Sequence, residues 1–384
     1  MSTKKDTRSV KLERLFSLRC LPIRFGLTQR LDLLIFPYIS GNKNILCPIS
    51  TTRKVLGEFM FILAPINHAN DMKHLAQSGA DEFYIGFYET SWASNNERFY
   101  DLNRMSDFAE DANRYSLPEL IEPIEEAHRL GKKIYVTLNA PYYNPNQLRM
   151  LQEYIRKLKE FKVDGVIVSN LRVADICRQE GISAVASTMC GVYNTQILST
   201  YAMSGVKRVI VPRDVRIEDV KRMKESFPEI EFEVFMMRNG CKFSDANCLG
   251  FHCYPHGALC RTLKFSKKQI GGTNLTFDLA QQLFFNDMMF KELYEHDACG
   301  MCAIYDFTEM NIHALKIVGR AAEQEHIAKS ITMVKANIAI AEQSSSRKEY
   351  LENMVFPSDP KTCFMGLSCY YPEIRFGAKH KLSD

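Results

Sequence analysis

The sequence predicts an α/β fold, a TIM-like (β/α)8 barrel with a cysteine-rich insertion after its seventh strand. Three observations favour this fold. Short apolar runs rich in β-branched and aromatic residues alternate with longer amphipathic segments, as in parallel strands joined by crossover helices. The runs number eight, which is the number of strands that closes such a barrel. The connection after the seventh run holds six of the twelve cysteines in the 384-residue chain. An open doubly wound sheet is the alternative fold.

The expected strands are short and almost continuously apolar, because both faces of a strand in a parallel barrel are buried. They are residues 59–65, 82–87, 133–138, 165–169, 183–187, 208–212, 231–237 and 314–318.

Helix start and stop signals lie between these strands. Ser116, with Glu119 three residues later, forms a capping-box pattern, and Gly131 is expected to end that helix before the third strand. Another helix is expected over residues 194–203. Residues 323–343 form an amphipathic segment with isoleucine and valine near one side, which predicts the eighth helix of the barrel.

The two ends of the chain differ from the expected barrel. Residues 1–30 hold eight Lys or Arg against two acidic residues, and we expect residues 1–57 to be a flexible or spurious basic leader. An organellar transit peptide is the other explanation, since the leader lacks the apolar core of a secretory signal. The barrel is expected over 58–343, including the cysteine-rich insertion at 238–302, and residues 344–384 are a C-terminal tail.

Charge and hydropathy bear on two classes of protein. Outside the leader the chain is nearly neutral, so its charge gives little support for a nucleic-acid footprint of the kind that a basic stripe provides. No run approaches eighteen apolar residues, so no membrane span is expected. We therefore expect a cytoplasmic protein.

Polar residues follow nearly every expected strand at its carboxyl end, where the active sites of (β/α)8 barrels lie. A helix cap or a loop position explains each one singly, but their equivalent positions indicate a substrate site. An arginine fork holds a carboxylate or phosphate through two hydrogen bonds, so Arg213 and Arg320 are expected to bind an anionic substrate. Ordinary ion pairs explain either arginine equally well. The full set is Asn67, Asn139, Asn170, Thr188, Arg213, Arg238 and Arg320, and the three asparagines are expected to orient the substrate.

Eight of the twelve cysteines fall between residues 241 and 369. In a chain without a secretory signal this grouping favours metal ligation over disulfides, since the cytosol keeps thiols reduced. Six of the eight lie between the seventh strand and the short helix before the eighth: Cys241, Cys248, Cys253, Cys260, Cys299 and Cys302.

The spacing of these cysteines favours an iron–sulfur cluster, with zinc as the alternative metal. Cys299 and Cys302 form the tight pair typical of structural zinc sites. The pairs at 241 and 248 and at 253 and 260 are each separated by six residues, which is wide for a zinc knuckle but acceptable around a larger cluster. The three-cysteine motif of radical SAM enzymes is absent.

Several motifs occur in a characteristic order along the chain. Residues 63–65 (LAP) are followed by residues 79–81 (GAD), then by residues 131–139 (GKKIYVTLN) and residues 316–320 (KIVGR). This series resembles that of the collagenase-like peptidase family U32, whose corresponding later motifs are GKKVYVTLN and KIEGR. The similarity runs from about residue 59 to residue 320, and the chain is identified as a member of that family.

The resemblance implies a chemistry that the family name does not describe. Bacterial relatives act in oxygen-independent hydroxylation of ubiquinone precursors or of bases in tRNA and rRNA, and they carry a 4Fe–4S cluster on four cysteines. For the RNA-modifying members prephenate is implicated as the hydroxyl source, and some relatives work as pairs of homologous proteins. Carried over to this chain, the resemblance assigns the cluster to Cys241, Cys248, Cys260 and Cys299, with Cys253 and Cys302 as alternates.

The chain also departs from the family pattern. Met237 and Val318 stand where the family has a histidine and a glutamate, so two candidates for proton transfer or metal binding are missing and no catalytic residue is assigned. The further cysteines Cys302, Cys363 and Cys369 either replace a ligand, hold a second centre or have no role.

Three functions are compatible with the sequence. The preferred one is a 4Fe–4S protein for oxygen-independent hydroxylation of an RNA base or a quinone precursor, with RNA or a small aromatic molecule as substrate and prephenate as co-substrate. The second is a collagenase-like peptidase, although the chain has no serine nucleophile elbow and no H-E-x-x-H helix. The third is a non-catalytic iron–sulfur or zinc accessory protein that works with a homologous partner.

Overall fold

The computed structural model describes residues 60–95, 102–104, 112–238, 244–246, 298–357 and 369–376. Eight parallel strands form a closed barrel in sequential order, from β1 to β8. The expected (β/α)8 barrel is confirmed, and the alternative of an open doubly wound sheet is wrong. The expected leader, 1–57, and most of the cysteine-rich insertion lie outside the described residues.

The strands match the apolar runs of the sequence. β3 and β7 have the expected bounds, and the other six strands are one or two residues shorter than expected. Residue 59, where the first strand was expected to begin, lies outside the described residues. Pairing of β8 with both β7 and β1 closes the barrel. The strands are β1 (Phe61–Pro65), β2 (Glu82–Ile85), β3 (Lys133–Leu138), β4 (Gly165–Val168), β5 (Ala184–Ala186), β6 (Arg208–Ile210), β7 (Glu231–Met237) and β8 (Ala314–Ile317).

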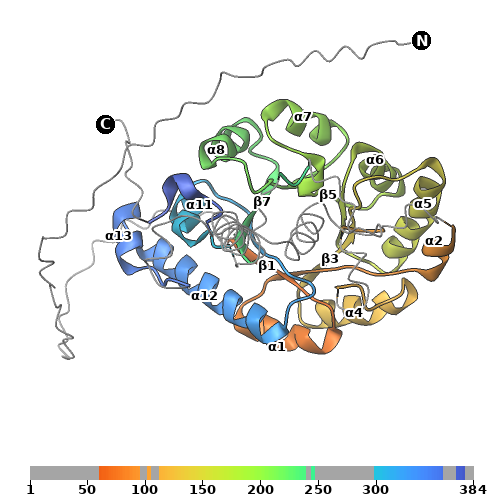
Figure 1. Cartoon of the computed structure of the whole chain (residues 1–384), viewed down its shortest axis with the longest axis horizontal. Helices are drawn as coiled ribbons and strands as arrows, with labels where there is room; N and C mark the ends of the chain where they lie inside the picture. Colours follow the sequence, from red (N-terminus) through yellow and green to blue (C-terminus); the bar gives the residue numbers. More distant parts are fainter. Residues whose placement is uncertain are drawn as a thin grey trace, which may run out of the picture. The chain divides into compact units, whose positions relative to one another are not determined.

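The helices form a ring around the strands (Figure 1). Within the described residues, no helix is both long and apolar enough to cross a lipid bilayer. The α-helices are α1 (Met72–Ser78), α2 (Thr90–Asn95), α4 (Ile121–Arg129), α5 (Pro145–Glu160), α6 (Leu171–Glu180), α7 (Thr195–Met203), α8 (Ile217–Ser226), α11 (Ile304–Glu309), α12 (Gln324–Gln343) and α13 (Arg347–Asn353). Short 3-10 turns are η1 (Ala69–Asp71), η3 (Pro118–Leu120), η4 (Thr188–Cys190), η5 (Met301–Ala303) and η6 (Pro372–Ile374).

The helix signals of the sequence are partly realised. Gly131 takes a left-handed φ of 68° just after Leu130, the C-cap residue of α4, as expected for a helix stop. The Ser116–Glu119 pair differs from a full capping box, because one Glu119 oxygen accepts from both the Ser116 N–H and the Ser116 hydroxyl at 2.7 Å. The hydroxyl is therefore used as a donor, and the turn η3 precedes α4.

The barrel interior contains paired charges. Arg208, at the start of β6, donates to both carboxylate oxygens of Glu82 at 2.6 and 3.0 Å and to Glu231 at 2.7 Å. Lys316 of β8 donates to Glu233 of β7 at 2.8 Å. Glu82, Arg208, Glu233 and Lys316 are at most 6% exposed. Removing a charge from water costs several kcal/mol, so each buried charge requires its partner.

Two tyrosine rings cover the buried cations. The Arg208 guanidinium carbon lies 4.9 Å from the centre of the Tyr135 ring, and the Lys316 nitrogen lies 3.8 Å from that of Tyr84. Burial raises the pKa of both tyrosines above their ordinary value, so they stay neutral at physiological pH. Their rings attract the cations without adding charge to the interior.

We predict that Glu82→Gln destabilises the barrel by about 3 kcal/mol, because it leaves the buried Arg208 guanidinium without its main counter-charge. The free energy of unfolding in urea measures the effect. Glu218→Gln is the matched control, since the Glu218–Arg222 pair of α8 is exposed and its loss is expected to cost less than about 1 kcal/mol. Equal losses in the two variants would contradict the prediction.

Candidate functional site

Arg320 follows β8 and is 4% exposed at the carboxyl end of the barrel. Its Nη1 donates to Asn113 Oδ1 and to Thr137 Oγ1 at 3.0 Å each, and its Nη2 donates to Asn103 Oδ1 at 2.9 Å. All three acceptors are neutral, and no described carboxylate forms an ion pair with Arg320. Burial lowers the pKa of Arg320 to about 10, which still leaves the guanidinium charged at neutral pH.

The neutral acceptors around Arg320 hold one another in place. Asn103 Nδ2 donates to Asn113 Oδ1 at 2.9 Å and to the Phe87 carbonyl at 3.3 Å. Gly86 leaves the space for the guanidinium, because a Cβ atom there would lie 1.6 Å from Arg320 Nη1. The orientation of the Arg320 guanidinium is thus determined by loops that follow β2 and by β3 itself.

Arg213 belongs to a second charged group, which we call the arginine clasp and which consists of Arg104, Arg213 and Asp245. Arg213 donates to the two Asp245 oxygens at 2.9 and 3.2 Å, and Arg104 donates at 2.5 Å. Asp245 is fully buried. Burial acts to raise the pKa of Asp245, but the two arginines outweigh it and hold that pKa at about 2. Two cations and one carboxylate give the clasp a net positive charge.

Aromatic rings support the clasp. The Arg213 guanidinium carbon lies 4.7 Å from the centre of the Phe235 ring and 5.9 Å from that of Tyr370. Tyr370 in turn stacks on Phe235, with 5.6 Å between ring centres and 18° between ring planes. Arg213 is therefore held by an ion pair and by two rings, one of which comes from the C-terminal part of the chain.

The three predicted asparagines have partners within the protein. Asn170 caps the N-terminus of α6 by accepting from the Val173 N–H at 3.2 Å, which is the simpler role considered for it. Asn139 Oδ1 accepts from the Arg104 N–H at 3.2 Å and so supports the clasp. Asn67 Oδ1 accepts from Gln324 Nε2 at 3.1 Å.

Sequence reasoning missed the residues that connect these groups. Asn103 contacts Arg320 and the adjacent Arg104 contacts Asp245, so two consecutive residues link the predicted arginines. Neither lies at a strand end, and no periodic pattern distinguishes them from other loop residues. Asp245 lies among the cysteines of the insertion, where the sequence analysis considered only metal ligands.

Cys299 and Cys302 are the predicted metal ligands that fall within the described residues. Cys241, Cys248, Cys253 and Cys260 lie outside them. The Cys299 sulfur accepts from the Met301 N–H at 3.4 Å, and the Cys302 sulfur accepts from the Phe376 N–H at 3.2 Å. Such bonds stabilise thiolates and surround iron–sulfur clusters, so these two cysteines fit a thiolate-bound metal. Within the described ranges, no group of three Cys, His, Asp or Glu side chains could hold a metal ion.

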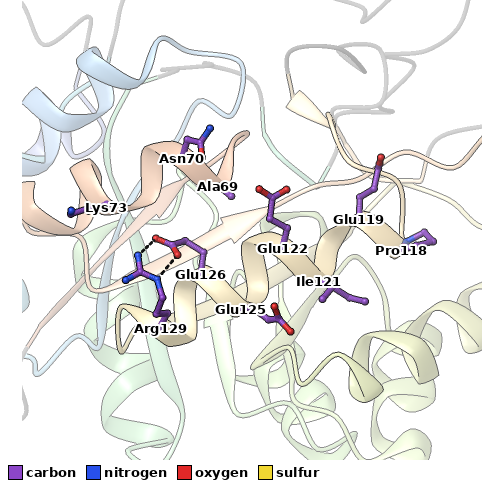
Figure 2. A pocket seen from close by; sticks show the side chains of 10 residues that line it. All are labelled: Ala69, Asn70, Lys73, Pro118, Glu119, Ile121, Glu122, Glu125, Glu126 and Arg129. Atoms are coloured by element: carbon purple, nitrogen blue, oxygen red, sulfur yellow. Dashed lines mark hydrogen bonds and ion pairs between the residues drawn. The ribbon is translucent and has the colours of Figure 1, made fainter.

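A hollow of about 850 Å³ lies on the outer flank of the barrel, between α1 and α4 (Figure 2). Glutamates of η3 and α4 line much of it, and Arg129 binds one of them, Glu126, through two hydrogen bonds of 2.6 and 2.7 Å. None of the predicted site residues lines this hollow. We therefore assign the candidate site to the carboxyl end of the barrel.

Comparison with known proteins finds relatives that align with much of the chain. The tRNA hydroxylation protein P1 of Bacillus subtilis is 25% identical over 344 residues, which cover 86% of this chain and 76% of that protein. The 23S rRNA 5-hydroxycytidine synthase of Escherichia coli is 23% identical over 328 residues, covering 82% of this chain and 46% of that protein. An uncharacterized protease of Methanocaldococcus jannaschii is 27% identical over 199 residues, covering 52% of this chain and 41% of that protein.

The chain thus spans less than half the length of the second and third of these relatives. The model of Peptidase family U32 matches residues 67–368. This match includes all strands from β2 to β8, the Arg320 group and the arginine clasp. Since it covers most of the chain, the protein belongs to Peptidase family U32.

Proposed function

We propose that this protein acts in the oxygen-independent hydroxylation of an RNA base and that it carries a 4Fe–4S cluster. Two relatives that align with more than 80% of the chain are named for hydroxylation of tRNA and for synthesis of 5-hydroxycytidine in rRNA. These names favour RNA over a quinone precursor as the substrate. RNA as substrate makes the cytoplasm the expected location.

The observation that carries the proposal is the buried charge of Arg320. A guanidinium has five N–H donors, and described residues use two on Nη1 and one on Nη2. The two remaining donors belong to Nε and Nη2, which are close enough to bind both oxygens of a carboxylate or phosphate. Because no described carboxylate neutralises Arg320, an anionic group of the substrate would gain a charge-assisted contact there.

The arginine clasp adds to the attraction for an anion. Its net positive charge lies beside the Arg320 group, because Asn103 and Arg104 are consecutive residues. An RNA phosphate or the carboxylates of prephenate, the expected co-substrate, are anions of the kind that this charge favours. In this proposal Arg320 and Arg213 bind the anion, and Asn139 supports the clasp through Arg104.

The cluster is expected on Cys241, Cys248, Cys260 and Cys299, with Cys253 and Cys302 as alternates. When bound, an iron–sulfur cluster supplies electron transfer at a potential that its surroundings adjust. The sulfur atoms of Cys299 and Cys302 accept hydrogen bonds from backbone N–H groups, as the sulfurs around iron–sulfur clusters do. Zinc is the alternative metal. Prephenate is proposed as co-substrate of the hydroxylation reaction and has no role in the other two functions.

Two other functions have less support. A peptidase is suggested by the family name and by the M. jannaschii relative, but Met237 is a buried apolar residue where the family carries a histidine. An accessory protein that binds no substrate of its own would not use the anion-binding donors of Arg320, so the accessory role leaves the Arg320 group unexplained.

The function is tested by deleting the gene in its native host and analysing tRNA and rRNA nucleosides by mass spectrometry after anaerobic growth. We expect one hydroxylated nucleoside to disappear and wild-type protein to restore it. Arg320→Met should fail to restore it, because the variant lacks the anion contact, while Arg222→Met on the exposed face of α8 should restore it fully. An unchanged nucleoside profile in the deletion strain would rule out RNA hydroxylation.

Metal content tests the cluster. Anaerobic purification should yield about four irons and four sulfides per chain with a broad visible absorption. Cys241→Ala and Cys299→Ser are each expected to lose most of the iron, whereas Cys177→Ser, a buried residue of α6, should keep it. One zinc and no iron in the wild type would argue against redox chemistry.

The clasp predicts a pH-dependent contribution to stability. Asp245 has a pKa of about 2 in the folded chain and about 3.9 when unfolded, so its charge contributes about 2.5 kcal/mol above pH 4. This contribution is lost as the pH falls through 2. Asp245→Asn should therefore be less stable than wild type at pH 6, and the gap should narrow towards pH 2 in urea unfolding. A gap that is constant with pH would contradict the assignment.

A further inference from the structure

The C-terminal segment brings a second cysteine beside Cys299. Residue 299 pairs in antiparallel fashion with Met237 at the end of β7 and in parallel fashion with Cys369 on its other side. The Tyr370 N–H donates to the Cys299 carbonyl at 3.0 Å, which fixes this register. Neighbouring strands lie about 4.8 Å apart, and directly paired residues direct their side chains to the same face. The side chains of Cys299 and Cys369 therefore leave the backbone side by side.

The segment that carries Cys369 is anchored by specific contacts. The Tyr371 hydroxyl donates to the Phe235 carbonyl at 2.9 Å, and the Ile217 N–H donates to Glu373 at 3.0 Å. Gly300 allows the Tyr371 ring to pack, because a Cβ atom at Gly300 would lie 2.9 Å from that ring. These contacts fix the position of Cys369 relative to Cys299 before any ligand binds, which lowers the entropic cost of binding.

Two cysteines that face each other on paired backbones can share one metal ion. A thiolate lies about 2.3 Å from zinc, so two sulfurs on one ion are at most about 4.6 Å apart. A spacing of about 4.8 Å between paired strands lets two cysteine side chains reach one ion or one cluster without a change of backbone. The backbone N–H that Cys299 already accepts supports the negative charge that ligation requires.

We propose that Cys369 is a thiolate ligand of the same metal centre as Cys299, so that the C-terminal segment completes the metal site. The inference rests on the metal centre of the proposed function but not on its RNA substrate. A 4Fe–4S cluster takes four thiolates. Cys299 and Cys369 then supply two of the four, so Cys369 takes the place of one of the other three cysteines that the family resemblance assigns to the cluster.

The first test compares Cys369→Ser with wild type and with Cys177→Ser, all as full-length chains purified anaerobically. Iron, zinc and sulfide are measured, together with the visible spectrum and the paramagnetic resonance of the reduced protein. We expect Cys369→Ser to lose metal as Cys299→Ser does, and Cys177→Ser to match wild type. Wild-type metal content and spectra in Cys369→Ser would overturn the proposal.

A second measurement does not depend on the folding of a variant. Wild-type protein is alkylated with iodoacetamide before and after metal removal by a chelator, and the modified peptides are quantified by mass spectrometry. Cys299 and Cys369 should both be protected in the metal-bound protein and alkylated once the metal is removed, because the thiolate that binds the metal is also the nucleophile that reacts. Equal reactivity of Cys369 with and without metal would overturn this proposal alone. A wild type that binds no metal would overturn the proposed metal centre as well.

Discussion

The ion pair between Arg208 and Glu82 crosses the interior of the barrel, because β6 and β2 lie four strands apart in a closed ring of eight. The Arg208 guanidinium also lies 3.8 Å from Glu233, which binds Lys316, so the two pairs form one network. A shift of any of these strands by one residue would turn a charge out of the interior and leave its partner buried alone. The network thus fixes the register on which the loop positions depend.

The network also determines the electrostatics of the barrel mouth. Within the network the buried carboxylates and cations balance one another. Arg320 and the arginine clasp add positive charge at the carboxyl end of the barrel. Burial is the main cause of the lowered pKa of Lys316, and Arg320 contributes to the lowering while Glu233 opposes it. Arg320 and Lys316 are therefore kept close together by neighbours whose positions are fixed. An anion bound at this end of the barrel would meet a positive potential that is already in place.

The sequence predicted the barrel well because each strand is buried on both faces and therefore reads as a continuous apolar run. The bounds of β3 and β7 were predicted fully, and Arg213 and Arg320 were identified from their places after β6 and β8. The environment of these arginines was not predictable, since Asn113 and Arg320 are 207 residues apart and Asp245 lies in a long connection. Periodicity describes which face of an element is buried and carries no information on such long-range polar contacts. For the same reason the ligand set among the cysteines stays a prediction from motif resemblance.

The position of Tyr370 and Tyr371 has a consequence for biosynthesis. Tyr371 binds the carbonyl of Phe235, which is 136 residues earlier in the chain. When β7 and β8 leave the ribosome, the ring that covers Arg213 and the strand that pairs with Cys299 have not yet been made. The mouth of the barrel can therefore be completed only after nearly the whole chain has been translated.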